Sequence, residues 1–147
     1  MNVLSLDVAS TTSWAIDKDT YGTWDMRTRK DESMGMKLIR FRAKLKEVIK
    51  KAEISIVLYE RPAGQHTSSV MHQSKLIAII EEECESSGVE YRAYSAKELK
   101  QFATGKGNSG KPAMIAAAKE RWDYPGEDDN EADAIIMREL FRAETNL

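Results

Sequence analysis

The sequence has one cysteine, two histidines and no long apolar run. A single cysteine cannot form an internal disulfide, so Cys84 is expected to be a small core residue. Two histidines without a cluster of cysteines exclude a zinc site of the usual kind. No apolar stretch approaches the roughly 20 residues that a membrane span needs, and the N-terminus lacks the pattern of a signal peptide. These absences favour a cytoplasmic protein.

The sequence also lacks an excess of positive charge. Its formal net charge is −2, which argues against a protein that binds nucleic acid simply by being basic. Basic residues concentrate in 37–51 and 97–121, and acidic residues in 81–85 and 127–133. A near-neutral total can therefore hide a basic face beside an acidic pocket. One basic stripe is typical of a solvated helix face; it consists of Lys37, Arg40, Lys44 and Lys51.

The pattern of apolar residues predicts a single domain over residues 1–147 with an α/β fold. Three short strands come first, and helices alternate with strands after them. The predicted strands cover 2–8, 13–17, 21–27, 54–60 and 89–94, and the predicted helices cover 34–52, 70–86, 96–103, 111–122 and about 129–143. A three-strand meander followed by this alternation predicts a mixed sheet with helices packed on its faces.

Two carboxylates stand at the ends of predicted strands. Asp7 lies in the first apolar strand, where a charge is rarely buried unless it is paired or bound to a metal. Glu60 ends the fourth strand and would lie beside Asp7 if the two strands pair. Each has an ordinary alternative, because Asp7 could bond backbone groups of a turn and Glu60 could pair with Arg61. The sequence favours the metal-ligand interpretation of Asp7, because Leu6 and Val8 flank it inside the predicted strand.

The acidic cluster 127–133 is the most specific feature of the sequence. Asp133 lies beyond the predicted helix start, and it shares a helical face with Asp129, four residues earlier, and with Asn130, three residues earlier. Capping by Asp128 or Asp129 explains part of the cluster but not Asp133. The alanines on either side of Asp133 would let this helix approach the sheet closely.

Hard oxygen ligands of this kind favour Mg²⁺ or Mn²⁺. Several carboxylates can hold two such ions roughly 4 Å apart, the arrangement that supports phosphodiester cleavage. A Gly-rich loop at 105–110 lacks the spacing of a P-loop. Lys106 and Lys111 flank bare backbone N–H groups there, which favours phosphate contact over a plain connector. The sequence therefore predicts an acidic metal site with a phosphate-binding loop.

Taken together, these segments resemble the RuvC-type Holliday junction resolvases, and most of all the short versions carried by bacteriophages. The segments are Leu4-Ser5-Leu6-Asp7 with Thr12-Ser13-Trp14-Ala15, then Tyr59-Glu60, then Lys97–Lys111, then Asp129-Asn130-Glu131-Ala132-Asp133-Ala134. The resemblance covers nearly the whole chain. It implies an RNase H-like fold with a five-stranded sheet, a homodimer, and paired nicks in a four-way DNA junction with two Mg²⁺ or Mn²⁺ ions per active site. A phage-encoded protein of this kind would act in the host cytoplasm.

The resemblance also implies roles for particular residues. Asp7, Glu60 and Asp133 would be catalytic metal ligands, and the fourth ligand is Asp129 or Asn130. Asp129 is favoured because it is charged and shares a helical face with Asp133. The residues expected to contact DNA are Arg61, Lys100, Lys106 and Lys111.

One departure from the resemblance follows Glu60. Bacterial members carry an aromatic residue shortly after this glutamate, whereas 61–64 has none, so junction opening and sequence preference stay open. Two other functions also stay open: a nuclease for RNA–DNA hybrids or flaps, and a junction-binding protein without turnover. The candidate dimer contact is helix 70–86, through Val70, Met71 and Leu76.

Overall fold

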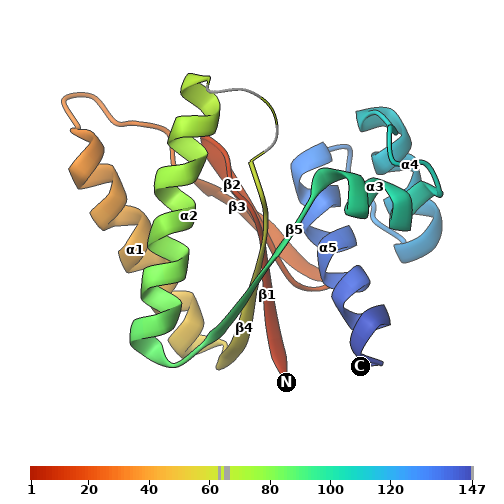
Figure 1. The fold of residues 1–147 in the computed structure, drawn as a ribbon, viewed down its shortest axis with the longest axis horizontal. Coiled ribbons are helices and arrows are strands. Elements are labelled where there is room, and N and C mark those ends of the chain that lie inside the picture. The colour runs from red at the N-terminus through yellow and green to blue at the C-terminus, as the bar shows by residue number, and fades with distance from the viewer. Residues whose placement is uncertain (63, 65–66, 147) are drawn as a thin grey trace.

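The computed structural model describes residues 1–62, 64 and 67–146; Ala63, which belongs to the segment after Glu60, lies outside this part of the chain. The described residues form one five-stranded sheet with helices on both faces (Figure 1). The strands are β1 (Asn2–Asp7), β2 (Thr11–Asp17), β3 (Thr20–Asp25), β4 (Ile54–Glu60) and β5 (Glu90–Tyr94). The helices are α1 (Met34–Lys51), α2 (Ser68–Ser87), α3 (Ala96–Thr104), α4 (Lys111–Trp122) and α5 (Asp129–Thr145).

The sheet order is β3-β2-β1-β4-β5. The first three strands are antiparallel, whereas β4 pairs parallel with both β1 and β5. This topology confirms the predicted α/β fold, with its meander and its parallel strands. The strand predicted over 13–17 begins earlier, at Thr11, because Thr11 and Thr12 pair with Asp25 and Trp24 of β3. None of the described helices is long and apolar enough to cross a membrane.

Each face of the sheet has its own apolar core. Leu4 and Leu6 of β1 point to the face covered by α1 and α2, where Cys84 is buried as predicted. Val3 of β1 packs on the opposite face with α5, and α3 and α4 lie outside α5 (Figure 1). Because β1 is central and covered on both sides, a charge at its end is enclosed rather than solvated.

The prediction of a solvated basic stripe on α1 is wrong at Lys37, which is only 2% exposed. The chain between β3 and α1 folds back over this part of the helix. The Arg40 guanidinium donates to the carbonyl oxygens of Asp25 at 3.2 Å and of Arg27 at 2.9 Å. It also pairs with Glu32 at 2.9 Å. Helical periodicity cannot reveal a loop that covers the outer face.

Helix α5 begins at a specific cap. The Asp128 carboxylate accepts the backbone N–H groups of Asn130 at 2.8 Å and Glu131 at 3.1 Å. The Glu131 side chain in turn accepts hydrogen bonds from Thr23 of β3 at 3.2 Å and from the Tyr124 hydroxyl at 2.9 Å. Fully buried alanines at the two positions flanking Asp133 let the helix lie close against the sheet. The first turns of α5 are therefore fixed against the sheet.

Candidate metal centre

The predicted acidic residues converge where β1 and β4 end. Asp7 is the last residue of β1 and Glu60 the last residue of β4. The two strands are parallel and neighbouring, with Leu6 opposite Tyr59, so the two carboxylates emerge side by side at one end of the sheet. Helix α5 adds Asp133, whose negative charge raises the pKa of Asp7. Strand pairing and helix packing therefore bring together carboxylates that are more than 50 residues apart in the sequence.

Burial and mutual repulsion shift the proton affinity of this cluster. Asp7 is 7% exposed, and burial, followed by the charges of Asp133 and Glu60, raises its pKa well above the ordinary value. Burial is also the main cause that raises the pKa of Asp133 to about 7, with the charges of Glu60 and Asp129 adding to it. Burial raises the pKa of Glu60, and Lys100 opposes that rise. The cluster therefore favours a compensating positive charge.

A cavity of about 260 Å³ opens beside the cluster, between α3, α4 and α5. One carboxylate oxygen of Asp133, Oδ1, is buried without a hydrogen-bond partner among the described residues. Buried polar atoms are normally satisfied, so an orphaned carboxylate oxygen beside a cavity indicates a binding role. The charged residues that line the cavity are Glu60, Lys100, Lys111, Asp129 and Asp133.

The two candidates for a fourth ligand lie differently. Asp129 lines the cavity, and its carboxylate is 3.7 Å from the ammonium group of Lys111. Asn130 is not among the lining residues, and its backbone N–H is donated to the Asp128 cap. The arrangement therefore favours Asp129 over Asn130.

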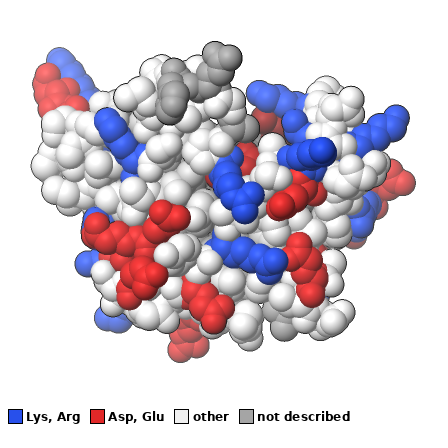
Figure 2. Space-filling view, viewed as in Figure 1, with Lys and Arg blue, Asp and Glu red and all other residues white. Residues whose placement is uncertain are grey.

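The predicted DNA-contacting residues divide into two pairs. Lys100 and Lys111 line the cavity, whereas Lys106 and Arg61 do not. Lys106 is exposed on the Gly-rich loop, and the Arg61 guanidinium donates to the carbonyl oxygen of Ala93 at 3.4 Å. Figure 2 shows Lys and Arg side chains interspersed with Asp and Glu side chains on the face drawn, rather than gathered into a continuous basic area.

Sequence reasoning missed Ser109, which is buried at the cavity wall. Its hydroxyl lies 2.5 Å from that of Thr104 and donates to the carbonyl oxygen of Lys106 at 2.8 Å. These bonds hold the Gly-rich loop against the end of α3. A serine inside a glycine-rich segment gives no sign in the sequence that it is buried, so only the folded loop identifies it.

In the described part of the chain, no three His, Cys, Asp or Glu side chains stand in an arrangement that could hold a metal ion. Like charges at short range repel one another, and this repulsion works against close approach of the carboxylates. The set of metal ligands stays a prediction, supported by the unsatisfied oxygen of Asp133 and by the coupled charges.

Comparison with solved structures shows the same fold in DNA-processing proteins. The RuvC structure of Thermus thermophilus matches with a TM-score of 0.77 at 16% identity, over 99% of this chain and 97% of that one. T. thermophilus RuvC in complex with a Holliday junction substrate gives 0.78 at 17% identity, over 99% and 96%. The yeast mitochondrial Holliday junction resolvase Ydc2 gives 0.62 at 12% identity, over 92% and 75%. No family model and no curated protein sequence matches the chain.

Proposed function

We propose that this chain is a Holliday junction resolvase, an endonuclease that nicks four-way or branched DNA by metal-assisted hydrolysis of a phosphodiester. The observation that carries the proposal is the coupled carboxylate cluster of Asp7, Glu60 and Asp133 at one end of the sheet. The fold adds support, because one structure with this fold was determined with a Holliday junction substrate. The sequence identity to these structures is 17% or lower, so the site residues support the proposal more strongly than the overall likeness does.

The residues present fit divalent cations. The unsatisfied Oδ1 of Asp133 and the enclosed carboxylate of Asp7 both need a positive partner. Their oxygen donors suit Mg²⁺ or Mn²⁺, and in this proposal Asp7, Glu60, Asp133 and Asp129 would be the carboxylates that hold two ions. When bound, such ions would supply an activated water and would stabilise the charge on the leaving oxygen.

The chain's own residues then supply position and charge. Asp7 and Glu60 are held by paired strands, which fixes their backbones more firmly than a loop would. Lys100 and Lys111 line the same cavity as Glu60, Asp129 and Asp133, and their ammonium groups would contact phosphate oxygens of the bound DNA. These contacts would orient the phosphodiester over the carboxylates.

A homodimer belongs to the proposal, because two symmetric nicks need two symmetric active sites. Met71 of α2 is 56% exposed and fits the predicted contact helix. Leu76 does not, because it is fully buried in the core of its own chain. The predicted contact set is therefore wrong at Leu76, since the apolar stripe of α2 faces the sheet. The likeness to short bacteriophage versions and a site of action in the host cytoplasm stay predictions.

The test is cleavage of a synthetic four-way junction in Mg²⁺, run beside an RNA–DNA hybrid and a flap. We expect paired nicks in the junction and at least hundredfold less cleavage by Asp7→Asn, because a ligand is lost. The matched control is Asp19→Asn, an exposed aspartate in the turn between β2 and β3, which should cleave as the parent does.

Each other outcome contradicts a stated part of the proposal. Preferential cleavage of the hybrid or the flap would assign a different substrate to the same chemistry. Tight junction binding without nicking in Mg²⁺ or Mn²⁺ would make the chain a binding protein. Unimpaired cleavage by Asp7→Asn would remove Asp7 from the site.

A further inference from the structure

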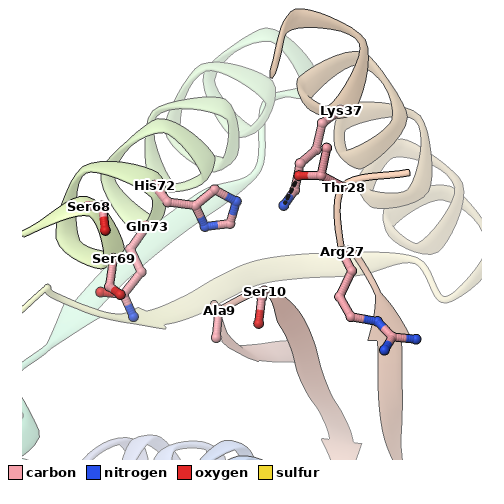
Figure 3. Close-up of a pocket in the computed structure, with 9 residues that line it drawn as sticks. All are labelled: Ala9, Ser10, Arg27, Thr28, Lys37, Ser68, Ser69, His72 and Gln73. Carbon is pink, nitrogen blue, oxygen red and sulfur yellow. Dashed lines mark hydrogen bonds between the residues drawn. The ribbon is translucent and has the colours of Figure 1, made fainter. Parts of the chain in front are cut away.

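A second cavity, of about 520 Å³, lies on the other face of the sheet, between the first turns of α1 and α2 (Figure 3). Its floor is the turn after β1, with Ser10, and one wall is the segment after β3, with Thr28. Lys37 of α1 and His72 of α2 point into it from two sides (Figure 3). None of the described residues that line this cavity is an aspartate or a glutamate.

Lys37 is the unusual residue of this cavity. It is 2% exposed, and its ammonium group has one hydrogen bond, to the Thr28 hydroxyl at 3.5 Å. Lys37 is in none of the ion pairs among the described residues, and the two carboxylates whose charges act on it, Glu32 and Asp25, are each paired with an arginine. Arg27, also in the lining, is already paired with Asp25 at 2.7 Å. Buried charges are normally paired, so Lys37 lacks the negative partner that its burial calls for.

Two further groups in the cavity can donate hydrogen bonds to an anion: the imidazole of His72, in its Nε2–H tautomer, and the amides at the start of α2. The Nε2 atom of His72 is buried without a partner among the described residues. At the start of α2, the Thr67 side chain accepts the backbone N–H of Val70 at 3.2 Å. The preceding amides, of Ser68 and Ser69, belong to the helix turn that has no acceptor of its own, and both residues line the cavity. The helix dipole adds partial positive charge at that end.

We propose that this cavity binds a phosphate group, and that in the junction complex it holds a backbone phosphate of the DNA. The second part rests on the proposed function. A phosphate offers several oxygens in a tetrahedral arrangement, so it can accept from Lys37, His72 and the α2 amides at the same time. A cation or an apolar ligand would leave these donors unsatisfied.

The position suits a phosphate close to the cut. Ser10 follows Asp7 by three residues, so their Cα atoms are at most about 11 Å apart. The cavity therefore opens near the end of β1 that carries Asp7, because Ser10 lines it. One DNA strand carries a phosphate for about every 3.4 Å of helix axis. A strand laid over this end of the sheet would meet both sites.

The first measurement uses inorganic phosphate and the whole chain, with binding followed by ³¹P line broadening and calorimetry. We expect saturable binding, weakened at least tenfold by Lys37→Met and about threefold by His72→Phe. The control is Lys50→Met, the same change at an exposed position of the same helix, which should bind phosphate as the parent does. Circular dichroism and stabilisation by Mg²⁺ check that each variant is folded.

The second measurement uses four-way junction DNA and the Asp7→Asn background, so that no cleavage is needed. Loss of one phosphate contact should weaken binding several-fold and flatten the slope of log K against log salt by about 0.9. This change should follow Lys37→Met and not Lys50→Met.

The outcomes separate the two proposals. Absence of saturable phosphate binding by the parent chain would overturn the site. Phosphate binding that depends on Lys37, with unchanged salt slopes, would overturn the DNA contact and leave a site for free phosphate. A change of molar mass with Lys37→Met at unchanged phosphate affinity would make the cavity a contact between subunits and overturn the site. If only the nuclease assay fails, the proposed function is contradicted and the phosphate site is not.

Discussion

At the residue scale, Asp133 should make the metal-free protein sensitive to pH. Its pKa is raised from 3.8 to about 7 in the folded chain, mainly by burial and then by Glu60. An unfolded chain would release this proton near pH 4, so the folded state binds more protons between pH 4 and 7. Stability therefore falls as the pH rises through that window and levels off above it. Urea unfolding at pH 5 and pH 8 in a chelator measures this fall.

The variant Asp133→Asn tests the origin of that pH dependence. Its free energy of unfolding at pH 8 without metal should be about 2 kcal/mol higher than that of the parent, because a buried charge is removed. It should also lose most of the stabilisation that Mg²⁺ or Mn²⁺ gives the parent. Asp19→Asn is the exposed control. A parent that is more stable at pH 8 than at pH 5 in the chelator would contradict the assignment.

Individual residues of the candidate site differ in how well the sequence predicted them. The positions of Asp7 and Glu60 at the ends of two neighbouring strands were predictable from the apolar runs that precede them, whereas their role as metal ligands stays a prediction. The choice between Asp129 and Asn130 was not predictable, because both share a helical face with Asp133 and only the packing of α5 directs one of them toward the cavity. Lys37 was wrongly predicted to be solvated for the same reason, since tertiary contacts decided its burial.

At the element scale, the start of α5 is the part of the fold on which the site depends. Asp128→Ala removes the cap that accepts two backbone N–H groups and should cost about 1 kcal/mol of unfolding free energy. Fraying of this turn moves Asp129, so junction cleavage should fall about tenfold. Urea unfolding and the initial rate of nicking measure the two effects.

The matched control is Gly88→Ala, which disturbs the C-terminal end of α2, where Gly88 has a positive φ of 69° that strains an alanine. This helix carries no member of the carboxylate cluster. It should lose a similar free energy with cleavage unchanged. Equal loss of cleavage in both variants would mean that global stability, and not the position of α5, limits the reaction.

Elements were easier to predict than their arrangement. Hydrophobic periodicity and turn residues identified every described helix and strand to within a few residues, including the Ser95–Glu98 capping box of α3. The parallel pairing of β1 with β4 followed only from the order of elements and the family resemblance. The folding of the β3–α1 segment over Lys37 followed from neither, because it depends on Arg40 reaching backbone carbonyls.

At the scale of the whole molecule, one end of the sheet serves two sites. The carboxylate cluster faces α5, and the cavity proposed to bind phosphate faces α1 and α2, both near the end of β1. With a net charge of −2, the chain has little general attraction for DNA. Binding to DNA would then depend on a few placed cations, which in the two proposals are Lys37, Lys100 and Lys111.

The proposed homodimer is tested at the scale of the whole molecule. Met71 projects from α2 at 56% exposure, and an apolar side chain so exposed is available to a partner. Met71→Glu should give a monomer in light scattering, keep its stabilisation by Mg²⁺, and nick one strand of a junction without the matched second nick. Ile39→Glu, on the exposed face of α1, is the control and should stay dimeric. A parent chain that is monomeric with and without junction DNA would remove the dimer. A substituted glutamate is buried only if the partner covers its surface. If Ile39→Glu alone gives a monomer, the dimer contact therefore lies on α1 and not on α2.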